Sequence, residues 1–479
     1  MKNDCPNLRL NLAPCSKSGN GFVDYIDVSI YIEGLATLKG GSVFSLAKST
    51  VTIPFCPLEG EIAISDDEGE VPIEIKHEKE GFLEREQYIT QRDIVGSLSV
   101  CYRVKPRVQP DDYRSSPYFD FVSEEGGANG AGLTFLPQFG KEEMFNFSLK
   151  WDLANMPSGS RGLWSIKEGD FTLPLKAQEI CYSYYAVGLM QSIEKDNFGF
   201  YWFSDPSFPV KEAAEKIQEL FLYMAKFFED EGEPYKVFAR RNKNASKGGT
   251  ALKRSYLFGY KYEEALTVDE LLNLFAHEMV HNWPHINDEP YGTGNWYSEG
   301  AAEYYSVVLP QRAGITSLEE ALQALCAKTD GYYANPRRDL SNEAAAKEFW
   351  TDRNTQRIPY GRGLIYIIDT DARIRAKSGG KRSVDDIVLE IGRRIKEDPK
   401  LGNELWVSLV SRELETDEWI IFNEYMSGKP QTPPTTAFGG AFRSIPHTFT
   451  VENSDNTNNA GMQQGYKWEI NPDFTGRYL

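Results

Sequence analysis

Three of the five histidines in this chain lie close together, at His277, His281 and His285. The first two flank a glutamate, and together they form an H-E-x-x-H motif, His277-Glu278-Met279-Val280-His281. Residues four apart lie on one face of a helix, so both imidazoles can bind one metal ion. Glu278 then projects beside the metal, where it can deprotonate a water molecule. A helix whose two histidines merely contact other protein groups is the alternative, but chance explains this spacing poorly in a chain with so few histidines.

A third ligand is expected soon after the motif, because a catalytic zinc ion takes three protein ligands and keeps one position open. The segment NWYSEGAAEYY, residues 295–305, offers Glu299 at the expected start of a helix capped by Ser298. Glu303 lies one turn later, where it either accepts the outer N–H of a ligand histidine or is a partly buried helix carboxylate. His285 follows Pro284, which disfavours continuation of a helix, so we interpret it as a loop or surface histidine.

The elements that must position these residues differ between the two halves of the chain. Residues 1–205 alternate between polar and apolar side chains, as in FVDYIDVSIYI, which predicts an antiparallel β-rich domain. The glycine-rich stretch from Glu124 is expected to be a flexible loop. Residues 206–428 carry helical periodicity and form the predicted catalytic domain, with helices near 209–230, 298–309, 317–328, 360–377 and 383–397. The polar residues 429–479 are expected to be an irregular segment, and the fold class is α+β.

Composition excludes several classes of partner. The net charge of −18 disfavours nucleic-acid binding, and no apolar stretch is long enough to cross a membrane. The six cysteines are widely spaced, which favours free thiols in a reducing compartment over a disulfide framework. With no signal peptide recognised, we expect a cytoplasmic protein. The sequence indicates no oligomeric state.

These motifs resemble those of a known enzyme family. H-E-x-x-H followed by W-x-x-E-G, with Glu299 as its glutamate, is similar to the gluzincin metallopeptidases. The segment EGAAEYYSVVLPQRAGI resembles the E-G-x-x-x-Y-Y signature of the glycyl aminopeptidase family, and PYGRG and SGGKRSVDD resemble its later landmarks. The resemblance implies a thermolysin-like, mainly helical domain that binds zinc through His277, His281 and Glu299. It also implies Glu278 as general base and Tyr360 as hydrogen-bond donor to the oxyanion, in the hydrolysis of peptide or amide bonds near a chain end.

Two departures from that family bear on the substrate. Gluzincin aminopeptidases carry, on a glycine-rich edge strand, a glutamate that binds the substrate's α-amine. Here Gly248 and Gly249 remain as candidate cleft residues, no carboxylate follows, and Lys253 and Arg254 are either cleft cations suited to a substrate carboxylate or solvent-facing. The peptide-binding PDZ domain common in the family is also not expected after Lys429.

The departures leave the substrate open between a peptide and a small molecule. The alternative function is a repurposed zinc enzyme that hydrolyses an epoxide or cyclises a small molecule. A catalytically idle binding protein is a third hypothesis, and the presence of Glu278 and Tyr360 argues against it.

Overall fold

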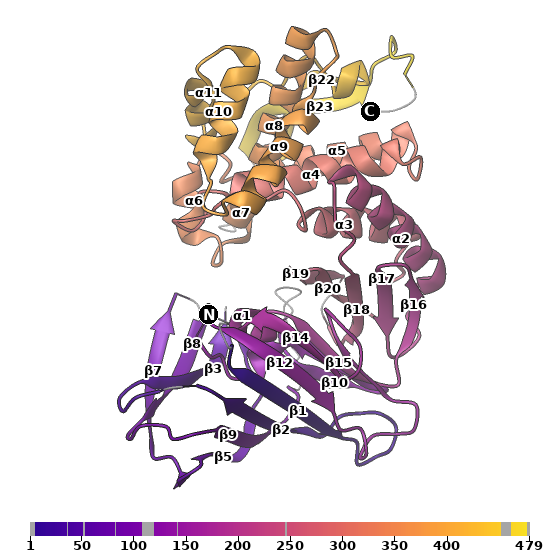
Figure 1. Cartoon of the computed structure of the whole chain (residues 1–479). Helices are drawn as coiled ribbons and strands as arrows, with labels where there is room; N and C mark the ends of the chain where they lie inside the picture. The colour runs from indigo at the N-terminus through magenta and orange to yellow at the C-terminus, as the bar shows by residue number, and fades with distance from the viewer. Residues whose placement is uncertain are drawn as a thin grey trace. The chain divides into compact units, whose positions relative to one another are not determined.

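The computed structural model describes residues 5–35, 37–50, 53–81, 83–107, 119–140, 142–244, 247–451 and 461–476 (Figure 1). The chain divides into two compact units. The N-terminal unit comprises Met1–Ala214 and Glu233–Thr267, and the helical unit comprises Glu215–Gly232 and Val268–Leu479. The division differs from the expected boundary after residue 205, because strands within 233–267 complete a sheet of the N-terminal unit.

Strand alternation builds the N-terminal unit. In β1 (Asn7–Cys15) and β2 (Tyr25–Glu33) every second residue is buried, so one face of the sheet packs into the core and the other is more accessible. Their sheet has the order β14-β12-β1-β2-β9-β5-β6. Its other strands are β5 (Leu58–Asp66), β6 (Gly69–Glu70), β9 (Leu98–Val104), β12 (Met144–Trp151) and β14 (Phe171–Lys176).

Three further sheets belong to the same unit, in the orders β4-β3-β8-β7, β10-β11-β15-β13 and β16-β17-β18-β20-β19. The first contains β3 (Ser42–Thr50), β4 (Ile53–Pro54), β7 (Ile73–Glu80) and β8 (Leu83–Thr90). The second contains β10 (Val122–Glu124), β11 (Gly127–Ala131), β13 (Arg161–Trp164) and β15 (Tyr184–Gly188), and α1 (Ala177–Cys181) precedes β15. The third contains β16 (Gln191–Lys195), β17 (Phe198–Trp202), β18 (Tyr235–Asn242), β19 (Gly248–Leu252) and β20 (Ser255–Lys261).

The glycine-rich stretch from Glu124 is not the flexible loop expected. It forms the hairpin of β10 and β11, and all five residues of β11 are buried. A Cβ at Gly127 would lie 2.5 Å from the carbonyl oxygen of Val187 on the neighbouring strand. The glycines therefore permit close backbone approach inside a sheet rather than mobility.

Helices dominate the second unit (Figure 1). The helix α2 (Val210–Phe227) begins in the N-terminal unit and continues in the helical one. The others are α3 (Val268–Val280), α4 (Asn295–Arg312), α5 (Leu318–Tyr333), α6 (Asn342–Glu348), α7 (Arg353–Gln356), α8 (Ile358–Ser378), α9 (Val384–Glu397), α10 (Asn403–Leu414) and α11 (Glu418–Met426). The five helical ranges expected from periodicity are confirmed, and Ser383 with Asp386 forms a capping box at the start of α9.

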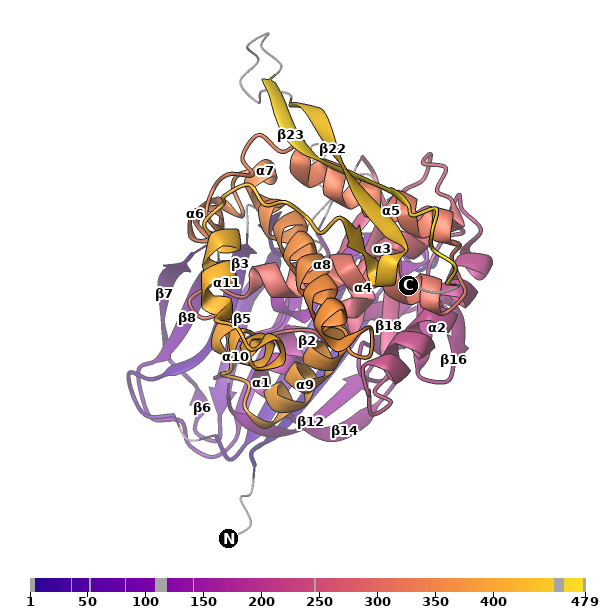
Figure 2. The same ribbon diagram turned by 90° about the horizontal axis from the view of Figure 1, so that it is seen from above.

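Two of these helices, α4 and α8, cross closely at a pair of glycines. Both are largely buried, and Figure 2 shows α8 running across α4. A Cβ at Gly300 would lie 2.5 Å from Cα of Gly363, and one at Gly363 would overlap the carbonyl oxygen of Trp296. The glycines thus bring the two backbones together, one residue after Glu299 and three after Tyr360.

The C-terminal residues form a small sheet rather than the irregular segment expected. Its strands are β21 (Thr436–Ala437), β22 (Phe442–Val451) and β23 (Gly461–Ile470), of which β22 and β23 pair as a ten-residue antiparallel hairpin. The hairpin packs on α5, where Phe449 stacks on Tyr333 with ring centroids 5.6 Å apart (Figure 2). Residues 452–460 and 477–479 of the predicted segment lie outside the described residues.

Two findings bear on the composition. All six cysteines are free thiols. Within the described ranges, no helix combines the length and the apolar character that crossing a membrane requires.

Candidate metal centre

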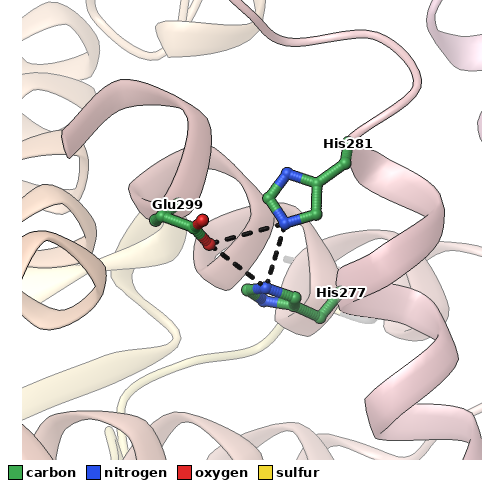
Figure 3. A group of neighbouring side chains, drawn as sticks. All are labelled: His277, His281 and Glu299. Carbon is green, nitrogen blue, oxygen red and sulfur yellow. Dashed lines mark hydrogen bonds and ion pairs between the residues drawn. The ribbon is translucent and has the colours of Figure 1, made fainter. Parts of the chain in front are cut away.

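The helix α3 presents the two histidines of the H-E-x-x-H motif. Its apolar residues Leu271, Leu272 and Phe275 are buried, which fixes the rotation of the helix about its axis. His277 lies in its last turn and His281 directly follows its last residue, and their Nε2 atoms are 3.2 Å apart. The two rings therefore converge on one point, as Figure 3 shows.

The helix α4 brings Glu299 to the same point. Asp288 accepts hydrogen bonds from the backbone N–H of Gly292 at 3.0 Å and of Gly294 at 2.6 Å, which orders the turn that leads into the helix. Because Gly294 occupies the N-cap position, Ser298 does not cap the helix as expected. The hydroxyl of Ser298 instead lies 3.4 Å from the carbonyl oxygen of Gly294, and Glu299 lies in the second turn.

The three side chains form a donor set for one metal ion. A nitrogen from His277, a nitrogen from His281 and an oxygen from Glu299 lie within 4.8 Å of one another. Oε2 of Glu299 is buried and lies 3.4 Å from each Nε2 atom (Figure 3). One proton shared between the two facing imidazole nitrogens would leave the Glu299 oxygen without a donor, whereas a single cation would satisfy all three ligand atoms. Two histidines and one carboxylate are a ligand set typical of catalytic zinc.

Electrostatics around the donor set are strongly coupled. Burial alone would lower the pKa of His281, but the charge and hydrogen bond of Glu299 outweigh it and raise the pKa to about 9. Burial would likewise raise the pKa of Glu299, but His281 and His277 hold it at about 2. The site thus favours positive charge, such as that of a metal ion.

Glu278 and Tyr360 lie beside the donors. Burial raises the pKa of the Glu278 carboxyl, which the two histidines partly offset. The ring of Tyr360, at the start of α8, stacks on His277 with centroids 5.7 Å apart and an interplanar angle of 6°. Burial, reinforced by the charge of Glu299, holds the pKa of Tyr360 well above 10, so the phenol keeps its proton at neutral pH.

Glu303 and a lysine that sequence analysis missed extend the site behind His277. Oε1 of Glu303 lies 3.4 Å from Nδ1 of His277, the ring nitrogen that does not face His281. Its other oxygen, Oε2, pairs with Nζ of Lys328 on α5. Lys328 lies 25 residues after Glu303 on a different helix, so spacing in the sequence gives no signal for this contact.

The remaining candidates are not among the three donor residues. His285 is exposed in the loop after α3, and its Nδ1 is 2.9 Å from the carbonyl oxygen of Trp283. Gly248 and Gly249 begin β19, an edge strand of the N-terminal unit.

Both cations that follow β19 have partners within the N-terminal unit. Lys253 pairs with Glu179. Arg254 donates to the carbonyl oxygens of Glu233 and Pro234, and its side chain is largely buried.

Comparison with known proteins places these residues in a family context. Residues 270–360 match the model of the M61 glycyl aminopeptidase family, a range that includes all the donor residues as well as Glu278, Glu303 and Tyr360. No curated protein sequence matches the chain.

Solved structures with the same architecture are peptidases and a hydrolase. An aminopeptidase N family protein from Idiomarina loihiensis superposes with a TM-score of 0.68 at 12% identity, over 94% of this chain and 80% of the other. An M1 zinc metallopeptidase from Deinococcus radiodurans gives 0.51 at 13%, over 90% and 95%. Leukotriene A4 hydrolase from Saccharomyces cerevisiae gives 0.51 at 15%, over 89% and 68%. At these identities the likeness shows the fold, a β-rich N-terminal part followed by a helical part.

The family match over residues 270–360 and this fold together support a zinc metallopeptidase-like hydrolase.

Proposed function

We propose that the protein is a zinc-dependent peptidase that hydrolyses peptide or amide bonds near a chain end. The observation that carries the proposal is the convergence of His277, His281 and Glu299 within 4.8 Å, with Glu278 on the same helix as both histidines. The match of residues 270–360 to the glycyl aminopeptidase family supports the same reading. The helical unit is then a thermolysin-like catalytic domain.

The proposal gives each side chain a part in the reaction. His277, His281 and Glu299 would hold zinc, which when bound polarises the scissile carbonyl and makes water more acidic. Glu278 takes a proton from the attacking water and passes it to the leaving amine as the C–N bond breaks. The raised pKa of its carboxyl brings this group nearer to the pH at which it must both accept and donate.

Tyr360 completes the site as a donor. Its phenol stays protonated and is held by stacking on His277, so it can donate a hydrogen bond to the substrate oxygen as that oxygen gains negative charge. Because the ring is ordered before substrate binds, little reorganisation is needed during the reaction.

Binding of a substrate's free α-amine would need an acceptor group near the metal centre. The strand β19 (GGTAL) contains no carboxylate, and the cations that follow it are paired with Glu179 and with backbone carbonyls. A free substrate amine would therefore have to find its acceptor elsewhere.

The test compares zinc-loaded protein on glycyl and alanyl amides with the same amides N-acetylated, and uses Glu278→Gln as the blank. Cleavage of the free-amine series alone, lost in the blank, is the expected result for an aminopeptidase. Cleavage of both series means a peptidase indifferent to the amine. No cleavage of either by protein that holds one equivalent of zinc contradicts the proposal and favours the small-molecule alternative, such as an epoxide substrate.

A further inference from the structure

Lys328 is a lysine buried in the helical unit next to the metal centre. It lies on α5, and its side chain is 16% exposed, whereas Lys347, which pairs with Glu343 on the surface of the same unit, is 72% exposed. Burying an ammonium group costs free energy unless an opposite charge compensates it. Its partner is the carboxylate of Glu303, itself only 13% exposed.

Glu303 connects this lysine to a donor of the metal centre. One carboxylate oxygen faces Nζ of Lys328 and the other lies 3.4 Å from Nδ1 of His277. The chain of contacts therefore joins three separate helices: Lys328 lies on α5, Glu303 on α4 and His277 on α3. A carboxylate that accepts the outer N–H of an imidazole fixes the ring's tautomer and leaves Nε2 free to bind a metal.

The charges of the site explain why a cation is needed there. The carboxylates of Glu278, Glu299 and Glu303 lie close enough together to repel one another. A divalent metal ion supplies two positive charges, and Lys328 supplies the third. Without the lysine, the Glu303 carboxylate would be buried with no compensating ammonium, and it would be driven to protonate or to turn away from His277.

We infer that Lys328 is a positioning residue of the metal centre: by pairing with Glu303, it holds that carboxylate against Nδ1 of His277 and so keeps Nε2 directed at the metal. The inference rests on the proposed function only in taking zinc as the occupant. It concerns metal affinity, which can be measured whatever the substrate is.

The experiment measures zinc affinity by chelator competition on the full chain, for wild type, Lys328→Met, Lys328→Arg and the control Lys347→Met. Lys328→Met is expected to weaken zinc binding about 10-fold or more, the lower end of the range for losing such an outer partner. Lys328→Arg keeps a cation and is expected to stay within about threefold of wild type. Lys347→Met should be unchanged. An affinity of Lys328→Met equal to wild type, or an Arg variant as weak as the Met variant, would overturn the inference.

A double variant separates positioning from a general loss of folding. If Lys328 acts through Glu303, then adding Lys328→Met to Glu303→Gln should change zinc affinity less than about twofold further, because the carboxylate that the lysine orients is already gone. The double variant also leaves no unpaired buried charge, so we expect it to fold even if Lys328→Met alone does not. A full additional loss in the double variant would contradict the inference. Wild type that binds no zinc would instead contradict the proposed function.

Discussion

At the scale of single residues, the environment of Tyr360 decides what its phenol can do. The ring lies parallel to that of His277, and burial together with the charge of Glu299 raises the pKa of the hydroxyl. The group is therefore a donor with no tendency to ionise near neutral pH, and its position depends on the same histidine that is proposed to hold the metal.

Tyr360→Phe tests the donor role. Removing one preorganised oxyanion donor typically lowers kcat about 100- to 1,000-fold, because the interaction forms only as charge develops. We expect a fall of that order, with zinc affinity and KM within a few-fold of wild type. Steady-state kinetics on an alanyl amide measures it, with the half-exposed Tyr262→Phe as the control. A Tyr360→Phe variant with unchanged kcat would remove Tyr360 from the proposed reaction.

Some residues of the site could be predicted from the sequence and others could not. His277, Glu278 and His281 are visible because a helix converts a spacing of four into one face, and Glu299 is visible because the next helix follows shortly. Lys328 and Asp288 are invisible to the same reasoning. The first acts from another helix, and the second acts through backbone N–H groups, which carry no side-chain signature.

At the scale of elements, the crossing of α4 and α8 brings Glu299 and Tyr360 to one place. Gly300 and Gly363 meet backbone to backbone, so neither can carry a side chain without moving a helix. Not every helical glycine is in such close contact. Gly392, in α9, has open space where its Cβ would be.

Gly363→Ala is therefore expected to be harmful and Gly392→Ala is not. The methyl group at residue 363 would overlap the Trp296 carbonyl oxygen, and such overpacking costs about 1–3 kcal/mol of the free energy of unfolding. At Gly392 the alanine should be neutral or stabilising by up to about 1 kcal/mol, from helix propensity. Denaturant unfolding of both variants gives the comparison, and equal stabilities would show that the crossing yields more easily than its geometry implies.

Periodicity predicted the helices well and the small strands poorly. The helix starting at Ser383 was identifiable because its cap and its apolar face agree. The hairpin β10–β11 and the strands β22 and β23 were not identified, since glycine, asparagine and threonine are also the residues of loops. These segments are strands because they pair with other strands, β11 with β15 and β22 with β23, and a local sequence pattern does not reveal such pairing.

At the scale of the whole molecule, the free energy of unfolding also depends on a buried lysine of the N-terminal unit, Lys236. Lys236 in β18 is 8% exposed, and its ammonium donates to the carbonyl oxygen of Ser165 at 3.0 Å. Burial lowers its pKa to about 8, although Glu168 and Glu194 oppose the shift. Between pH 8 and about 10.5 the unfolded chain holds a proton on this lysine that the folded chain has lost, so this group makes folding more favourable as pH rises through that window.

Lys236→Met should remove this dependence. Below pH 8, burial of the protonated lysine costs the folded state about 3 kcal/mol. Methionine removes that cost but also removes the hydrogen bond to Ser165, which is worth about 1 kcal/mol. We therefore expect the variant to be more stable than wild type by about 2 kcal/mol at pH 7, an advantage that shrinks towards pH 10.5. Unfolding free energies across that range measure the difference, with exposed Lys150→Met as the control. A difference independent of pH would contradict the account of Lys236.

The fold class, α+β with a β-rich N-terminal part and a helical part, was predictable from the change in periodicity. The division into units was not, because β18, β19 and β20 lie in sequence among helices yet belong to the N-terminal unit. All three proposed metal ligands lie within the helical unit, so one compact part of the chain contains the donor set.

The central claim is that this donor set serves a hydrolytic reaction through Glu278. The most direct measurement is turnover of an alanyl amide by wild type and by Glu278→Gln at the same loading of one zinc per chain, with the exposed Glu343→Gln as control. The account predicts that Glu278→Gln binds zinc as wild type does and is slower by at least about 100-fold, since general base catalysis contributes that much or more. Equal turnover in wild type and Glu278→Gln would contradict it.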